Sequence, residues 1–344
     1  MQNKLRIYSI LGAVALLLLF FVSILSGFYT IELESMGLLL RNIFSSEVHP
    51  NPTDAYIFYE VRLPRTIMGI VMGCGLAISG ASLQGMFKNP LATPSIIGIT
   101  SGAALFAAIS IVLGSSIKAV LPEYFHYMLL SLAAFLGAIL VMFLVYNISF
   151  KDGKTHVVIM LLAGVAISAL AEAITGYLTF ISNEEELRDL TFWRLGSLGA
   201  ANWNKVGILT LITGISCFFL LKNGKALNAM MLGEENAQHL GINIKRHHAA
   251  IIWFSSLIVG TSVAFAGTIG FVGLIVPYIL RLLIRSDYRV ILPLSALYGS
   301  VLLLGADIFS RTFMAPVEIP IGVITATMGA PVFIMILIRF KKSL

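Results

Sequence analysis

Charged residues are scarce in this chain. Only 12% of its 344 residues are Asp, Glu, Lys or Arg, whereas 58% are hydrophobic. A soluble domain carries roughly 25% charged residues, because its surface must be hydrated. So small a charged fraction cannot cover a water-exposed surface, which excludes an ordinary soluble protein and indicates a chain that crosses the membrane several times.

Cysteine, metal-binding and catalytic patterns are equally scarce. The two cysteines, Cys74 and Cys217, lie inside apolar runs, where a thiol behaves as a small buried hydrophobe, and we expect no disulfide. Apart from the adjacent His247 and His248, the histidines are scattered, so no metal site is indicated. No Ser-His-Asp or paired-carboxylate arrangement is recognisable. The sequence therefore predicts a protein that is not an enzyme.

A nucleotide-binding loop is also lacking. Gly153-Lys-Thr155 resembles the end of such a loop, but the full pattern needs a glycine five positions before Gly153, where Ile148 stands. We expect neither ATP nor another cofactor on this chain. The formal charge of +6 does not indicate a nucleic-acid partner, since the basic residues fall in short clusters between apolar runs instead of on one solvated face.

What the sequence does contain is long apolar segments. Each should be helical, because lipid offers the backbone no hydrogen-bond partners. The first is too long for a signal-peptide core and lacks an A-x-A cleavage site, so we expect a retained helix. The sequence predicts an all-α integral membrane protein with about ten transmembrane helices in a single domain, 1–344. The predicted segments are 7–28, 62–84, 94–113, 126–148, 156–181, 205–221, 248–266, 269–285, 291–309 and 321–339.

The basic residues give the topology. Most of the 23 lysines and arginines fall at the termini and in alternate connections, and most acidic residues fall in the opposite connections. Because basic loops stay in the cytoplasm, both termini are predicted to be cytoplasmic. The polar connection 30–61 is then external, and the connection 222–247 is cytoplasmic. Apolar spacing in the latter predicts two short amphipathic helices, broken at Gly233 and ended at Gly241, as a docking site for a cytoplasmic partner.

Five charged residues near or within the apolar segments need an explanation. Arg62 and Arg65 lie at the external end of the second segment and Arg311 near that of the ninth. They could reach lipid phosphate or receive acidic groups of an external partner. Asp307 precedes Arg311 by four residues, which predicts an intrahelical ion pair. Glu172 has no evident partner, and a carboxylate at membrane depth should face protein or water, which makes it a candidate pathway residue.

Several ordered motifs resemble those of the FecCD-type permeases, the membrane subunits of ABC importers for iron chelates and vitamin B12. The resemblance extends from about Leu11 to Ile338. It implies the type II ABC importer permease fold, with two copies, as a homodimer, around a central path. The matching stretches are Arg62-Leu-Pro-Arg65, Gly75–Gln84, Asn89–Ala92, Leu232–Glu235, Leu240-Gly241, Gly270–Pro277, Leu292–Ala296, Glu318–Gly322 and Gly329–Pro331.

The resemblance also implies partners and roles. Cytoplasmic ATPase subunits and an external substrate-binding protein complete such an importer in the bacterial inner membrane. Arg62, Arg65 and Arg311 match positions that receive acidic residues of the binding protein. The fifth helix is similar to the path-lining helix of the family, which makes Glu172 and Thr175 candidate pathway residues. The expected ATPase-coupling residues are Leu232, Gly233, Glu234, Glu235, Ala237, Leu240 and Gly241.

The cargo is less clearly indicated than the class. Thr191–Leu198, with Trp193 as a further pathway candidate, resembles the haem-importing branch, whereas Tyr278 and Tyr288 stand where the family often has histidine. The predicted function is import of an iron chelate, haem or a ferric siderophore, by alternating access. Two alternatives remain: the same importer carrying a corrinoid, and a secondary transporter driven by an ion gradient with Glu172 as its proton site.

Overall fold

The computed structural model describes residues 2–42, 51–114, 122, 126, 128–151, 154–284 and 286–343. Ten long or apolar helices coincide with the ten predicted segments. Eight of them are long and apolar enough to cross a membrane, and α5 and α14 are shorter apolar helices. The ten are α1 (Gln2–Leu25), α4 (Leu63–Met86), α5 (Ile99–Val112), α7 (Leu129–Ser149), α8 (Val157–Ile181), α10 (Trp203–Lys222), α13 (Ile244–Ala266), α14 (Val272–Ile284), α15 (Tyr288–Thr312) and α16 (Ile321–Ser343).

Shorter elements connect these helices. The 30–61 connection contains α2 (Leu33–Asn42), α3 (Pro52–Tyr56) and the π-helix η1 (Ile57–Arg62), and the 3-10 helix η2 (Pro94–Ile97) precedes α5. An antiparallel hairpin of β1 (Phe150–Lys151) and β2 (Lys154–Thr155) joins α7 to α8. The 222–247 connection forms α11 (Gly224–Met231) and α12 (Glu234–His239), which confirms the predicted pair of helices.

One further helix, α9 (Glu184–Leu195), was not predicted. Asn183 accepts a hydrogen bond from the backbone N–H of Glu186, and the Glu186 carboxylate accepts one from the backbone N–H of Asn183. This reciprocal capping satisfies two amides that would otherwise lack partners at the helix start. The Asn-x-x-Glu spacing was therefore a signal for a helix start in the sequence. It was overlooked because the prediction rested on apolar segments, and this segment is too polar to span a membrane.

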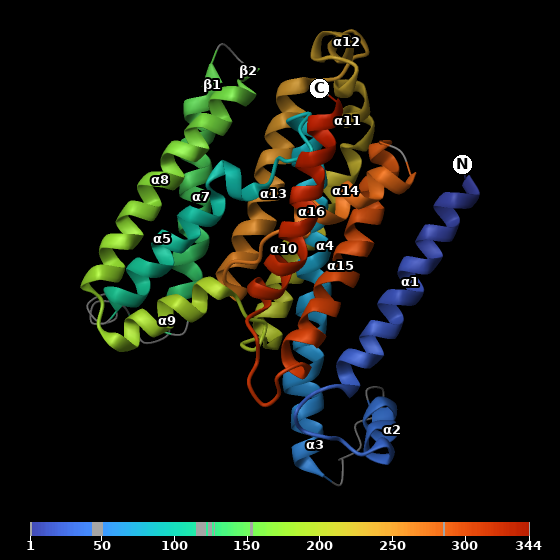
Figure 1. Cartoon of the computed structure of the whole chain (residues 1–344), viewed down its shortest axis with the longest axis vertical. Helices are drawn as coiled ribbons and strands as arrows, with labels where there is room; N and C mark the ends of the chain where they lie inside the picture. Colours follow the sequence, from blue (N-terminus) through green and yellow to red (C-terminus); the bar gives the residue numbers. More distant parts are fainter. Residues whose placement is uncertain are drawn as a thin grey trace.

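The helices form two groups in Figure 1. Helices α5, α7 and α8 lie together, while α4 lies among α10, α13, α14 and α15, with α1 beside α15. Helix α9 extends from the end of α8 toward α16. The beginning of α1, the end of α16, the hairpin and α12 lie at one end of the molecule, and α2 and α3 lie at the opposite end. The two long connections therefore occupy opposite ends, as the sequence predicted.

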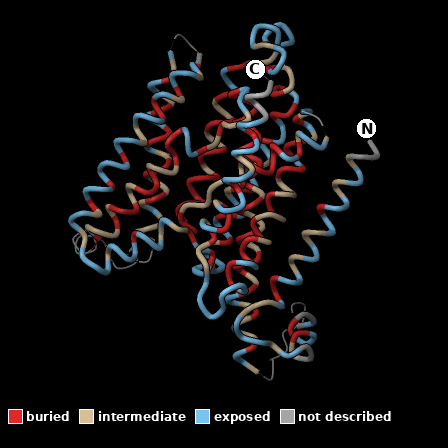
Figure 2. The backbone as a smooth tube through the Cα atoms, in the orientation of Figure 1, coloured by how far each residue is buried: buried red, intermediate tan, exposed pale blue. Residues whose placement is uncertain are grey.

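Small residues allow the central helices to approach closely. A Cβ atom on Gly73 would lie 2.3 Å from the carbonyl oxygen of Gly299, and one on Gly80 would lie 1.9 Å from that of Gly273. These contacts pack α4 against α15 and α14 at backbone distance. Helices associate in this way inside a membrane, because lipid is as apolar as their side chains and close packing takes the place of the hydrophobic effect. Figure 2 shows the buried residues concentrated in this central group.

Candidate functional site

Three of the charged residues predicted near the external end, Arg65, Asp307 and Arg311, form a network with Glu318. The Nε of Arg65 donates to Oδ1 of Asp307 at 2.9 Å, and its two terminal nitrogens bind Glu318 at 2.7 and 2.9 Å. The other oxygen of Asp307 lies 3.4 Å from the Nε of Arg311, which confirms the predicted pair within α15. Asp307 therefore neutralises two guanidinium groups from two different helices, since Arg65 lies in α4.

Two of the arginines also bind the end of α1. Arg311 donates to the carbonyls of Ser23 and Ser26 at 2.7 and 3.1 Å, and Arg62 donates to those of Ile24 and Leu25 at 2.7 and 3.1 Å. The last carbonyls of a helix have no partner within it, and cationic side chains satisfy them favourably. These contacts attach α1 to α4 and α15.

All three arginines are consequently buried in this chain. Arg62, Arg65 and Arg311 expose 3%, 6% and 6% of their surface, so none reaches outward toward lipid phosphate. Their predicted contact with a binding protein stays a prediction. Glu318 is the most exposed member of the network, with 43% of its side-chain surface accessible, whereas Asp307 is fully buried. The Arg65 guanidinium, which donates to that carboxylate, lowers the pKa of Glu318 against the opposing effect of burial.

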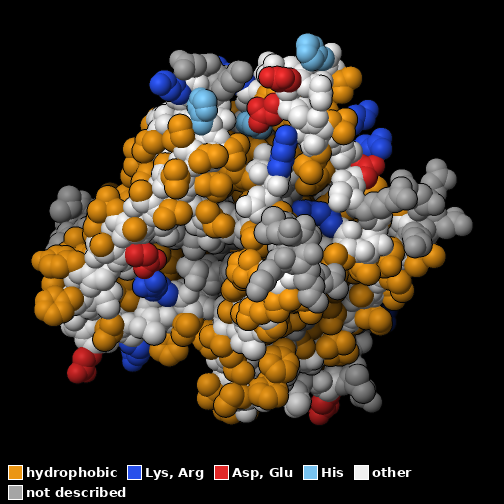
Figure 3. Space-filling model, turned by 45° about the horizontal axis from the view of Figure 1, so that its top comes forward, with side chains coloured by type: hydrophobic (Ala, Val, Ile, Leu, Met, Phe, Trp, Pro, Cys, Tyr) orange, Lys and Arg blue, Asp and Glu red, His pale blue; other side chains and the backbone are white. Residues whose placement is uncertain are grey.

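The opposite end carries the predicted coupling segment. Gly233 separates α11 from α12 with a φ of +116°, and Gly241 follows α12 with a φ of +83°, both favourable for glycine alone. Leu232 and Leu240 are 70% and 66% exposed, whereas Ala237 is fully buried. Glu234 and Glu235 lie exposed in the first turn of α12. Figure 3, which brings this end forward, shows charged side chains gathered there above largely apolar flanks.

Helix α11 is attached to the beginning of α15. The side chain of Asn228 donates to Oδ1 of Asp287 at 2.7 Å and accepts from the backbone N–H of Tyr288 at 2.9 Å. Asp287 caps α15, and the Arg289 guanidinium, with help from the Asn228 amide, holds the pKa of Asp287 far below its ordinary value. Sequence reasoning missed this clamp of Asn228 and Asp287, because the two residues are 59 positions apart.

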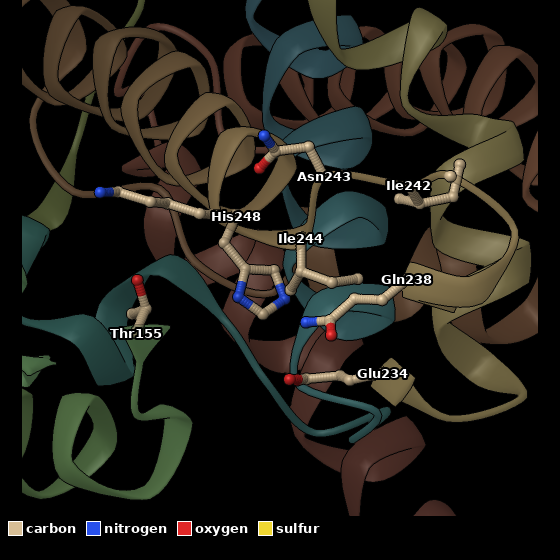
Figure 4. Close-up of a pocket in the computed structure, with 9 residues that line it drawn as sticks. Thr155, Glu234, Gln238, Ile242, Asn243, Ile244 and His248 are labelled. Carbon is tan, nitrogen blue, oxygen red and sulfur yellow. The ribbon is translucent and has the colours of Figure 1, made fainter. Parts of the chain in front are cut away.

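A polar cavity of about 380 Å³ lies between α12, the beginning of α13 and β2. In Figure 4 the His248 ring points toward the side chains of Glu234 and Gln238, and Thr155 lies on its other side. Among the described residues, no group of three His, Cys, Asp or Glu side chains is close enough to hold a metal ion. The cavity lies beside the exposed surface of α12.

The three predicted pathway residues are placed differently. Glu172 is exposed on α8, and its Oε2 lies 3.0 Å from Nη2 of Arg194 in α9, so it has the partner that the sequence did not reveal. Thr175 is buried and donates to the carbonyl of Ala171 within its own helix. Trp193 is partly buried and packs against the core. Glu172 is thus the one of the three that presents its side chain to the surface of α8.

The two cysteines also meet in the fold. The Sγ atoms of Cys74 in α4 and Cys217 in α10 lie 3.9 Å apart as free thiols. Their separation of 143 residues gave no indication of this. The contact lies within the packed helices, and we assign it to packing between α4 and α10.

This arrangement matches known transport proteins. The chain is 37% identical over 312 residues to the hemin transport system permease protein HmuU of Yersinia pestis, covering 91% of each chain. It is 38% identical over 283 residues to the vitamin B12 import system permease protein BtuC of Klebsiella pneumoniae, covering 82% of each.

Solved structures agree with this likeness. A structure described as an inward-facing conformation of a metal-chelate type ABC transporter superposes with a TM-score of 0.82 and 30% identity, over 98% of this chain and 100% of that one. PsaBC from Streptococcus pneumoniae shares the fold, at a TM-score of 0.55 and 16% identity. The fold is therefore that of a type II ABC importer permease. Since the model of the FecCD transport family matches residues 15–339, this chain belongs to that family of multi-pass membrane permeases.

Proposed function

We propose that this chain is the permease subunit that carries haem, or a closely related iron chelate, through the inner membrane of a bacterium into the cytoplasm. The observation that carries the proposal is the likeness to a hemin permease over 91% of both chains. The likeness to vitamin B12 permeases has similar identity but covers less of the chain. We therefore place haem before a corrinoid as the cargo.

The exposed leucines of the coupling segment support an ATPase partner at that end. Leu232 and Leu240 flank α12 and leave large apolar side chains in water, which is typical of a docking surface. Glu234 and Glu235 add negative charge between them. ATP hydrolysis then takes place on the partner chain, and both termini of the permease are cytoplasmic, since they lie at the same end as α12. A second permease copy and an external binding protein complete the importer.

The clamp of Asn228 and Asp287 gives a physical route for the coupling. A displacement of α11 by the ATPase would act directly on the beginning of α15, because Asn228 binds both Asp287 and the backbone of Tyr288. From there α15 continues for about 30 Å to Asp307, at 1.5 Å per residue. A packed helix moves as a rigid element, so the external charge network would move with the coupling segment.

The test is reconstitution of the permease with its ATPase and binding protein in liposomes. We expect uptake of haem that requires hydrolysable ATP. Uptake of a corrinoid in place of haem would keep the importer and overturn the cargo. Uptake driven by a proton gradient without the ATPase would overturn the importer and favour the secondary transporter.

A paired substitution tests the coupling surface. Reversing both charges, Glu234→Lys and Glu235→Lys, should abolish co-purification of the ATPase. The matched control is Glu184→Lys with Glu185→Lys, which reverses an equivalent exposed pair in the first turn of α9. Retention of the ATPase by the α12 variant, or equal loss in both variants, would contradict the assignment.

A further inference from the structure

Glu172 lies inside α8, a helix that is long and apolar enough to cross a membrane. It is nine residues before the end of α8 at Ile181, or about 14 Å along the helix axis. A carboxylate inside a spanning helix faces protein or water, since exposure to hydrocarbon costs at least a few kcal/mol. The neighbouring face of α8 carries large exposed apolar side chains, Leu170, Ile174 and Tyr177, and suits lipid. Glu172 therefore marks the face of α8 that does not contact lipid.

The same face of α8 mixes small residues with large apolar ones. Beside Glu172, the small exposed positions at helical spacing are Ala166, Ala169, Ala173 and Gly176, and the exposed side chains of Leu162, Val165 and Phe180 lie among them. A Cβ atom on Gly176 would meet nothing within 4 Å. The result is an apolar surface with one charged group at its margin. Such a surface fits an apolar molecule that carries a charged substituent.

Arg194 is held in place by its backbone and not by its side chain. The carbonyl of Arg194 accepts a hydrogen bond from the hydroxyl of Thr268. The carbonyls on either side of it lie so close to Gly267 and Gly322 that a Cβ atom there would come within 2.0 and 2.3 Å of them. The end of α9 is thereby fixed against the loop after α13 and the first turn of α16. Its guanidinium extends from this fixed base to Glu172 on the other group of helices.

The ion pair itself is incomplete. Nη2 of Arg194 contacts Oε2 of Glu172 at 3.0 Å, and both side chains are 46% exposed. Within the part of the chain that the structure describes, no other hydrogen bond from this guanidinium is present. A guanidinium offers five N–H donors in a planar fork that binds a carboxylate through two parallel hydrogen bonds. A second carboxylate can therefore replace Glu172 and bind more completely.

We propose that Arg194 is the cargo-binding group of the translocation path and that it recognises a carboxylate on an apolar chelate. Glu172 holds the guanidinium in position until the cargo carboxylate displaces it. This inference rests on the proposed function and makes the cargo class more specific. A porphyrin with propionate groups satisfies both the apolar face and the arginine, whereas a corrinoid, whose side chains end in amides, offers no carboxylate.

The test uses the complete importer in nanodiscs, titrated without nucleotide with haem and with haem dimethyl ester, whose propionates are uncharged. The wild-type complex should bind haem about 10- to 100-fold more tightly than the ester, as expected for a charge-assisted pair. Arg194→Gln should remove this preference and leave affinity for the ester unchanged. Glu172→Gln should strengthen haem binding, because it removes the competing carboxylate.

Two further variants keep the result interpretable. Glu172→Gln with Arg194→Gln leaves no unpaired charge, should fold normally, and should bind haem and the ester equally. Arg188→Gln removes an exposed arginine from the same helix and should preserve the preference. A preference for haem that survives in the double variant overturns the inference, as does a Glu172→Gln variant that weakens both ligands equally. Absence of ATP-driven haem uptake by the wild-type importer would instead overturn the proposed function.

Discussion

The network of Arg65, Asp307, Arg311 and Glu318 permits one prediction with a definite magnitude. Asp307 is completely buried between Arg65 and Arg311, at 2.9 and 3.4 Å. Asp307→Asn would leave two buried guanidiniums with Glu318 as their remaining carboxylate. Two unit charges about 4 Å apart interact by about 4 kcal/mol at an effective dielectric constant of 20. Removing one partner of a buried ion pair typically costs about 3–5 kcal/mol, and we expect a loss of stability in that range.

The measurement is thermal unfolding of the detergent-solubilised permease at one fixed scan rate. A loss of this size should lower the apparent melting temperature by about 10 °C, at about 2–4 °C per kcal/mol. Glu318→Gln is the control and should lower it much less, because that side chain is 43% exposed. Combined with Arg311→Met, Asp307→Asn should cost less than the sum of the two single changes. Additive effects, or equal losses for Asp307→Asn and Glu318→Gln, would refute the reasoning.

Two other outcomes follow from contacts at the two ends of α15. Asn228→Ala should preserve ATPase assembly and ATP hydrolysis but lower the amount of haem transported per ATP several-fold. Asn236→Ala loses a hydrogen bond to the Leu232 carbonyl in the same segment and should leave the amount of haem transported per ATP unchanged. Because Arg65 holds the pKa of Glu318 below its ordinary 4.5, the stabilisation by this carboxylate is complete above pH 4.5 and is lost as the pH falls through the lowered value. The difference in melting temperature between wild type and Glu318→Gln should therefore be constant from pH 7 to 5 and shrink below 4.5; a difference that grows on acidification contradicts this sign.

The features that the sequence predicted are those encoded locally. Ten apolar segments became ten helices because the length and hydrophobicity of a segment decide whether it spans lipid. The break at Gly233 and the end at Gly241 were predictable because each has a positive φ that glycine favours. The pair of Asp307 and Arg311 was predictable because residues four apart share one face of a helix.

The remaining features depend on contacts between distant segments. Glu172 and Arg194 are only 22 residues apart, but α9 lay in a stretch where no helix was predicted. Glu318 and Arg65 are 253 residues apart. No periodicity within a segment can indicate which helix its charged face will meet. The sequence therefore identified the residues that needed partners, and the packing of the helices decided the partners.

The three arginines that the sequence predicted to be external, Arg62, Arg65 and Arg311, show how this limits a functional assignment. An arginine on the side of the membrane where most charged residues are acidic could bind an external protein or stabilise the fold itself. The sequence left both possibilities open. In the structure, Arg62 and Arg311 satisfy the terminal carbonyls of α1, and Arg65 joins α4 to Asp307 and Glu318. A binding protein that used these arginines would have to compete with those partners. Glu318, half-exposed above Arg65, is the group whose displacement would release a guanidinium, by the same exchange of carboxylates that we propose for Glu172 and Arg194.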